Sequence, residues 1–125
     1  MTGLTLPEKY GGGGMDYISY AIVIEEIAKA CATTSVILAA HLSLCAIPIS
    51  IFGSDFLKDK YLKKLACGEY LGAFCLSEPG NGSDAAAMLT RAYDRTDHFL
   101  LNGTKAWITN GSEANVYLVL AQTDP

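Results

Sequence analysis

The sequence predicts an α+β fold in which an α-helical segment is followed by an antiparallel β segment of barrel or sandwich type. Two observations support this class. Before Gly68 the apolar residues recur at helical spacing, whereas after Gly68 they form short runs bounded by turn residues. An order in which the helices precede the strands is typical of an α+β fold rather than of repeated βαβ units. With 125 residues, the chain is long enough for one modest domain.

The first expected helix follows a glycine-rich turn at residues 11–14. Asp16 is its candidate N-cap, because a short acidic side chain can accept a hydrogen bond from a free amide of the first turn. The helix is expected to end near Thr33 and Thr34. Its apolar residues repeat at helical spacing through Tyr20, Ile24, Ile27 and Cys31.

Two further helices are expected before Gly68. The second helix is nearly all apolar and starts at about Ser35, and Pro48 should break or restart it because proline has no amide hydrogen. Ser54 is the candidate N-cap of the third helix. The buried stripe of this third helix is predicted at Leu57, Tyr61 and Leu65.

Four strands are expected after Gly68. Residues 70–77 form a short apolar run between turn signals, which is typical of a strand. Residues 88–94 and 98–109 flank a tight polar turn at residues 95–97, and this pattern predicts a hairpin. Residues 115–122 are rich in valine and leucine and form the last expected strand.

Composition argues against several classes of function. A net charge of −4 is not that of a nucleic-acid-binding surface. The cysteines show no CxxC pair and no metal-ligand spacing, so we predict no metal site and expect a reducing compartment. Residues 35–52 are apolar enough to raise the question of a membrane span. Because His41, Pro48 and several serines interrupt them, a buried core helix is favoured over a span.

The stretch Cys75–Asp84, CLSEPGNGSD, is a glycine-rich turn that could hold a ligand by its backbone. Its pattern Gly80-x-Gly82-x-x-Ala85 satisfies the dinucleotide-binding fingerprint, but a hairpin follows where that fold requires a helix. A phosphate-binding P-loop is excluded because no lysine follows the glycines. Two interpretations stay open: a turn whose amides, with Ser77 and Ser83, bind a polar ligand, or an ordinary surface turn.

A second segment, residues 102–111 (NGTKAWITNG), contains the only tryptophan. In a strand, Trp107 and Thr109 would lie on one face because side chains alternate with a period of two. An indole beside a hydroxyl suits a flat ring rich in heteroatoms, such as a flavin or a nucleobase. The alternative is that Trp107 is a core residue of a β-sandwich.

Together the two segments resemble the acyl-CoA dehydrogenase family, flavoenzymes that desaturate acyl-CoA thioesters. FCLSEPGNGSD followed by LNGTKAWITNG is similar to the paired motifs of that family, and the wording is most like its short-chain, butyryl-type members. Residues 10–38 and 52–69 resemble its N-terminal helices. The resemblance implies that residues 1–69 are part of a helical N-terminal domain and residues 70–125 part of a middle β-domain.

The resemblance also implies roles for individual residues. FAD would be contacted by Phe74, Leu76 and Ser77 from the first motif, largely through backbone amides and the Ser77 hydroxyl. From the second motif, Trp107 would lie against the isoalloxazine ring and Thr109 would donate near N5, with Ile108 between them. Ser83 would lie where the loop meets the acyl-CoA substrate.

The family reaction removes a proton from the α-carbon of the thioester while a hydride leaves the β-carbon for the flavin. The resemblance implies electron-transfer flavoprotein as the acceptor, a homo-oligomer in the full-length family, and the mitochondrial matrix or the bacterial cytoplasm as the location. The base of the family is a glutamate in a C-terminal helical domain that this chain lacks, so no catalytic residue is assigned. Glu78, the carboxylate in the loop, is expected to be structural.

We therefore expect the chain to be a fragment or truncated product of a short-chain acyl-CoA dehydrogenase, inactive by itself. The alternative is a non-catalytic remnant that acts as a binding or self-association module. A further alternative, an NAD-type binding domain, is supported by the glycine pattern alone.

Overall fold

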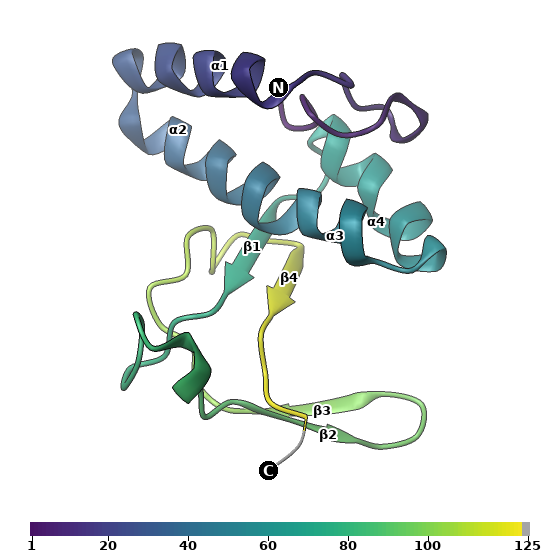
Figure 1. Cartoon of the computed structure of the whole chain (residues 1–125), viewed down its shortest axis with the longest axis vertical. Coiled ribbons are helices and arrows are strands. Elements are labelled where there is room, and N and C mark those ends of the chain that lie inside the picture. The colour runs from purple at the N-terminus through teal and green to yellow at the C-terminus, as the bar shows by residue number, and fades with distance from the viewer. Residues whose placement is uncertain (124–125) are drawn as a thin grey trace.

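The structure, a computed structural model, describes residues 1–123; residues 124–125, the end of the expected β segment, lie outside the described residues. Helices form one layer, and the strands extend from it as a smaller β part (Figure 1). The helical part comprises the 3₁₀-helix η1 (Glu8–Tyr10), α1 (Tyr17–Ala30), α2 (Ala32–Ala39), the π-helix η2 (Ala40–Ala46), α3 (Ile47–Phe52) and α4 (Asp55–Cys67). The β part comprises β1 (Gly72–Cys75), the 3₁₀-helix η3 (Ala85–Ala87), β2 (Arg91–Asp94), β3 (Phe99–Asn102) and β4 (Val116–Val119).

Both expected N-caps are confirmed. The Asp16 carboxylate accepts a hydrogen bond of 2.7 Å from the Ser19 amide, and the Ser54 hydroxyl accepts one of 3.4 Å from the Leu57 amide. The boundary after the first helix was expected near Thr33 and Thr34, but α1 ends at Ala30. Cys31 is extended there, and α2 begins at Ala32, so local backbone geometry rather than the threonines separates the two helices.

The second helical stretch contains a π-helical segment just before Pro48. In this segment the Ile47 amide donates to the Leu42 carbonyl, five residues back, instead of the usual four. Pro48 follows directly, and the backbone stays helical up to it, since Ala46 and Ile47 both have right-handed helical dihedral angles. Neither outcome expected at Pro48, a break or a restart, is observed: the helix runs without interruption from Ala32 to Phe52, with π-helical turns just before the proline.

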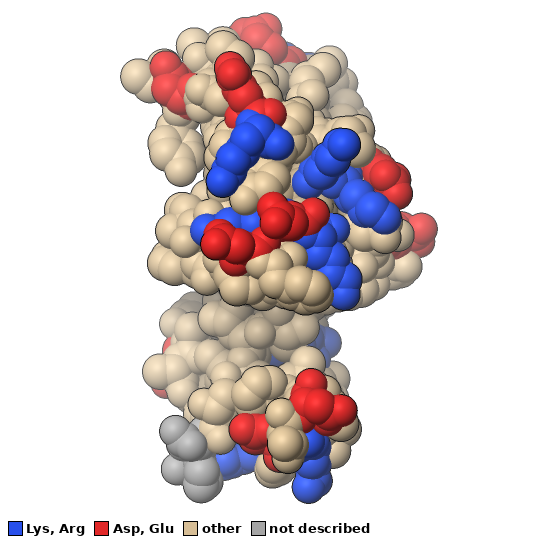
Figure 2. Space-filling view, turned by 90° about the vertical axis from the view of Figure 1, so that its right-hand side faces the viewer, with Lys and Arg blue, Asp and Glu red and all other residues tan. Residues whose placement is uncertain are grey.

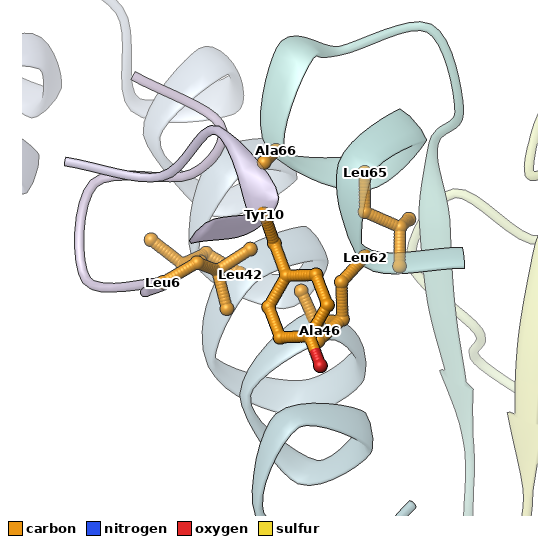
Figure 3. Packing of buried hydrophobic residues seen from close by; sticks show 7 residues of the cluster. All are labelled: Leu6, Tyr10, Leu42, Ala46, Leu62, Leu65 and Ala66. Atoms are coloured by element: carbon orange, nitrogen blue, oxygen red, sulfur yellow. The ribbon is translucent and has the colours of Figure 1, made fainter. Parts of the chain in front are cut away.

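The main cluster of buried hydrophobic side chains lies in the helical part. Its side chains converge from the N-terminal segment, η2 and α4 (Figure 3): Leu6, Tyr10, Leu42, Ala46, Leu62, Leu65 and Ala66. The predicted stripe of α4 was partly wrong, because Leu57 is 40% exposed and Tyr61 only half-buried. Leu65 is buried as predicted, but its buried neighbours are Leu62 and Ala66, one residue further round the helix.

The strands form two separate pairs among the described residues. β2 and β3 are antiparallel, which confirms the predicted hairpin. β1 and β4 are parallel, so the expectation of an antiparallel segment was wrong for them, and the barrel or sandwich arrangement is not observed in this part of the chain. The parallel pairing arises because the chain returns to the start of β1, where the Asn115 amide donates to the Leu71 carbonyl and the Asn115 side chain accepts from the Leu71 amide.

The second hairpin strand is shorter than predicted. β3 ends at Asn102, whereas the prediction extended it to residue 109. Gly103 follows with a φ of 159°, packed so closely on Thr90 that an added Cβ would clash with the threonine hydroxyl. Residues 104–109 are therefore not a strand, and the period-two argument that placed Trp107 and Thr109 on one strand face does not hold.

Charge is mixed on the surface. On the face seen in Figure 2, lysine and arginine side chains lie among aspartate and glutamate side chains. The helical stretch Ala32–Phe52 is long and apolar enough, by length and composition only, to cross a membrane, although only 33% of it is buried in this chain. Core helices of proteins in water meet the same criterion, and His41, Leu42 and Cys45 of this stretch lie in the interior.

Candidate functional site

A small hollow lies where η2, the end of β1 and the loop after β3 meet. Its volume is about 190 Å³. Eight residues line it: Ala40, Leu44, Phe74, Leu76, Ser77, Trp107, Ile108 and Thr109. The six residues predicted at a cofactor are all in this set, so two segments about thirty residues apart in sequence meet at one place.

Trp107 is the most unusual residue of the hollow. Its φ of 59° places it in the left-handed region, which a bulky aromatic residue seldom adopts and which costs free energy. Its side chain is 94% exposed. The alternative in which Trp107 is a core residue is therefore wrong for the described chain. A strained backbone that holds a large apolar side chain in the open is typical of a binding site.

The polar groups of the hollow are available to a ligand. Within residues 1–123, the backbone amides of Leu76, Ser77 and Thr109 donate to no acceptor of the protein. The hydroxyls of Ser77 and Thr109 are likewise not paired with any described residue. Phe74, Leu44 and Trp107 supply apolar surface around them. An apolar hollow with a few convergent donors is the usual form of a site for a flat heterocycle.

The two walls of the hollow are joined by Lys105. Its ammonium group donates to the Leu76 carbonyl at 3.0 Å and to the Glu78 carboxylate at 2.9 Å. The Ala106 amide donates to the Ser77 carbonyl at 2.9 Å. These bonds hold the segment after β1 that carries Leu76 and Ser77 against the loop that carries Trp107.

Glu78 is the buried partner of this arrangement. Its side chain is 4% exposed, and besides Lys105 it accepts from the amides of Leu89 at 2.6 Å and Thr90 at 2.9 Å. Hydrogen bonds from Thr90, from the Leu89 amide and from Lys105 hold the pKa of Glu78 well below its usual range. A carboxylate with so many donors is a weak base and has no proton to give, which agrees with the structural role expected for it.

Asn110 attaches the second wall of the hollow, the loop that carries Trp107, Ile108 and Thr109, to the rest of the protein. Its side-chain amide donates to the Gly72 carbonyl at 3.0 Å and to the Ile37 carbonyl at 3.3 Å. Its φ of 65° lies in the left-handed region, which asparagine tolerates better than most residues. The turn at Asn110 is therefore also an anchor, between the loop, β1 and α2.

The glycine-containing part of the turn, residues 78–84, lies beside the hollow, whereas Leu76 and Ser77 of the same stretch line it. Glu78 and Asn81 exchange backbone hydrogen bonds, and the Asn81 side chain donates to the Ala87 carbonyl at 2.7 Å. Ser83 is exposed and does not line the hollow. A Cβ added at Gly80 or Gly82 would meet nothing within 4 Å, so neither glycine is required by contacts within the described chain.

Two larger hollows are less suited to chemistry. One of them, about 820 Å³, lies between α3, the start of α4 and β4, and its lining is almost entirely apolar. Of the predicted residues only Phe74 borders it. The second, about 570 Å³, is an open depression between α2 and residues 108–113. Among the described residues, no three His, Cys, Asp or Glu side chains are grouped so that they could hold a metal ion.

Sequence reasoning missed the residues that assemble the hollow. Ala40 and Leu44 come from the apolar stretch and carry no motif, and Lys105 was not singled out inside NGTKAW. His41 was noted only as an interruption of that stretch. No local pattern could have identified them, because their partners lie 24 to 31 residues away for His41 and 27 to 29 for Lys105.

Comparison with known families gives two matches that together cover nearly the whole chain. Residues 1–69 match the family described as "Acyl-CoA dehydrogenase, N-terminal domain". Residues 73–125 match the family described as "Acyl-CoA dehydrogenase, middle domain".

Individual relatives agree with these matches. The chain is 49% identical to the human "Short-chain specific acyl-CoA dehydrogenase, mitochondrial" over 97% of its own length and 29% of the relative's. It superimposes on butyryl-CoA dehydrogenase from Megasphaera elsdenii with a TM-score of 0.94 and 45% identity, over 99% of this chain and 33% of that one.

A third relative was solved with a cofactor. It is an acyl-CoA dehydrogenase complexed with FAD from Bacillus anthracis, with a TM-score of 0.91 and 41% identity, over 98% of this chain and 21% of that one. The chain therefore spans a third or less of the length of each of these relatives.

Proposed function

The chain belongs to the acyl-CoA dehydrogenase family, and on that premise we propose that it supplies part of the FAD and substrate site of a short-chain acyl-CoA dehydrogenase. Residues 1–69 are part of the helical N-terminal domain and residues 70–125 part of the middle β-domain in this proposal. The observation that carries it is the hollow at Trp107, which gathers every residue expected at the flavin.

The residues of the hollow fit a flavin ring by their chemistry. Unpaired amides at Leu76, Ser77 and Thr109 match the acceptor-rich edge of such a ring, and the exposed indole of Trp107 offers a flat apolar face to it. Phe74 and Ile108 complete the apolar surroundings and exclude water. Ser83, on the glycine-rich turn beside the hollow, contacts the acyl-CoA substrate in this proposal.

FAD held by these residues would supply the hydride acceptor for oxidation of the acyl-CoA thioester to 2-enoyl-CoA. The part of this chain is to bind and orient the ring and to keep donors directed at its edge. Removal of the α-proton needs a carboxylate base. No carboxylate of the described chain lines the hollow, and Glu78 is held as a weakly basic anion. The chain by itself is therefore expected to be inactive.

The partners follow from the same proposal. The substrate is a short-chain acyl-CoA, and electron-transfer flavoprotein takes the electrons. The complete enzyme is a homo-oligomer and works in the mitochondrial matrix or the bacterial cytoplasm.

A flavin titration tests the cofactor. Trp107 is the only tryptophan of the chain, so its emission reports on the hollow alone. We expect FAD to quench this emission with saturation. Thr109→Val should weaken binding about tenfold, because one hydrogen bond to the ligand is lost. The matched control Thr104→Val alters an exposed threonine outside the hollow and should bind as the unmodified chain does.

Two results would contradict the proposal. The first is the absence of saturable quenching together with a colourless, stable oligomer, which would favour a self-association module instead. The second is clear binding of NAD without binding of FAD. The expected inactivity is tested separately with butyryl-CoA and an artificial electron acceptor, where flavin-dependent turnover by the chain alone would contradict it.

A further inference from the structure

His41 is a fully buried side chain to which the proposed site assigns no role. It lies in the π-helix η2 and is 0% exposed. Its Nδ1 accepts a hydrogen bond of 3.0 Å from the Gly72 amide, and its Nε2 lies 3.1 Å from the Leu65 carbonyl. An amide can only donate and a carbonyl can only accept, so Nδ1 is bare and Nε2 carries the proton. The ring is therefore neutral and held in one tautomer.

Gly72, whose amide donates to His41, begins the segment that forms the first wall of the hollow. Gly72 starts β1, and this strand leads directly to Phe74, Leu76 and Ser77. Both backbone polar groups of Gly72 are bound by side chains: the amide by His41 and the carbonyl by Asn110. Asn110 follows Thr109 in the second wall. Both walls are therefore fixed relative to this one residue.

The contact between Gly72 and the helix is direct. A Cβ on Gly72 would lie 2.7 Å from both Cβ and Sγ of Cys45, so the backbone of β1 rests directly on the Cys45 side chain of η2. The π-helical turns of η2 contact both the hollow and the start of β1. Ala40 and Leu44 line the hollow, while His41 and Cys45 face Gly72. A shift of β1 along η2 would therefore change the shape of the hollow.

We propose that His41 is a positioning residue for the flavin hollow, which it controls through the hydrogen bond from the Gly72 amide to Nδ1. As far as it concerns flavin, this inference rests on the proposed function. The bond from Nε2 to Leu65 joins the same ring to the end of α4 in the hydrophobic core. The imidazole thereby connects the core to the strand that forms the site.

Two substitutions separate the two bonds of the ring. In His41→Asn the amide oxygen can take the place of Nδ1, so the Gly72 bond is kept and the Leu65 bond is lost. In His41→Gln the longer side chain can reach Leu65 in place of Nε2, so the Leu65 bond is kept and the Gly72 bond is lost. Each variant leaves one buried group without a partner, and the two should lower the melting temperature by similar amounts.

Their effects on the site should differ. We expect FAD affinity, followed by Trp107 emission, to stay within about threefold for His41→Asn and to fall about tenfold for His41→Gln, the effect of one lost hydrogen bond. The controls are His98→Asn and His98→Gln, which alter the other, exposed histidine and should change nothing. Equal losses in both His41 variants, or no loss in either, would overturn the proposal and leave His41 with a purely structural role.

A second measurement does not need flavin. Amide hydrogen exchange of residues 72–77 should be about tenfold faster in His41→Gln than in His41→Asn. Nitrogen NMR of the ring should show Nδ1 without a proton in the unmodified chain. If the chain fails to bind FAD but exchange differs as expected, the proposed cofactor is wrong and the role of His41 in positioning β1 stands. Equal exchange in the two variants, or a proton on Nδ1, would overturn the inference.

Discussion

The helical part and the β part of this chain are held together by different kinds of interaction. The helical part has a continuous apolar core, in which Leu6, Leu62 and Leu65 are completely buried. The β part has no comparable cluster among the described residues, and all four residues of β3 are exposed. Its segments are joined instead by buried polar bonds, such as those from Lys105 and Asn110.

This difference explains where the binding residues lie. Apolar burial is non-directional and tolerates small shifts, whereas a hydrogen bond requires particular atoms at fixed distances. Six of the eight residues that line the hollow belong to the β part, where particular polar bonds set the geometry, and Ala40 and Leu44 come from η2. The core supports it from one side, through His41 and η2. The contrast therefore predicts that core substitutions change stability, while polar substitutions in the β part change the site.

The largest expected effect is on the free energy of unfolding, and it is obtained by comparing a leucine-to-alanine substitution in each part. Leu65→Ala creates a cavity in the core and should lower the free energy of unfolding by about 2–5 kcal/mol. Leu101→Ala, in β3, alters a side chain that is 50% exposed and should change it by less than about 0.5 kcal/mol. Denaturant unfolding followed by circular dichroism measures both. Similar losses in the two variants would mean that the β part has an apolar core of its own.

A second prediction concerns the buried ion pair of the β part. Lys105→Met leaves the Glu78 carboxylate without its countercharge and releases the Leu76 carbonyl. We expect amide exchange at Ala106 to rise about tenfold or more, and FAD affinity to fall, while the helical amides keep their protection. The double variant Lys105→Met/Glu78→Gln should recover part of the loss, because the unpaired charge is gone. The exposed Lys63→Met serves as a control.

A third pair of variants compares one side-chain bond in each part. Ser54→Ala removes the N-cap of α4 and should cost about 1 kcal/mol of stability. Asn115→Ala removes the bond from the Leu71 amide at the start of β1 and should cost about as much. Only Asn115→Ala should also weaken FAD binding, since only this residue borders the paired strands. An equal effect of the two variants on FAD would remove the distinction between the parts.

The smallest effect near neutral pH comes from His41. Burial lowers the pKa of His41, so in the unfolded chain, where the ordinary value is about 6.5, the ring takes up protons that the folded chain does not. The free energy of unfolding therefore falls as pH drops below about 6.5. Glu78 acts at lower pH, because its pKa is depressed in the folded state and its contribution is lost only below about 4.3.

Unfolding measured as a function of pH should resolve these two steps. His41→Asn, which cannot titrate there, should lack the first step and keep the second. An unchanged profile between pH 7 and 5 in that variant would show that another group causes the loss.

Much of the fold could be predicted from local signals. The caps at Asp16 and Ser54 and the hairpin around residues 95–97 each depend on a few neighbouring residues, and each is observed. The break or restart expected at Pro48 is not observed, since the helix continues through the proline. The direction of β4 was predicted wrongly, because it depends on where the chain returns rather than on the strand itself. The predicted buried face of α4 differs from the observed one by one residue, because the buried face depends on what packs against the helix.

The sequence by itself determined the local elements, and its two motifs determined which residues to expect at a ligand. Tertiary structure decided how those residues meet. Trp107 and Thr109 line one hollow although they are not in a strand, because Lys105 and Asn110 hold their loop against β1. Local signals act over a few residues, whereas these bonds join atoms whose residues are 29 and 38 positions apart in the chain. Only the folded chain brings them within hydrogen-bonding distance.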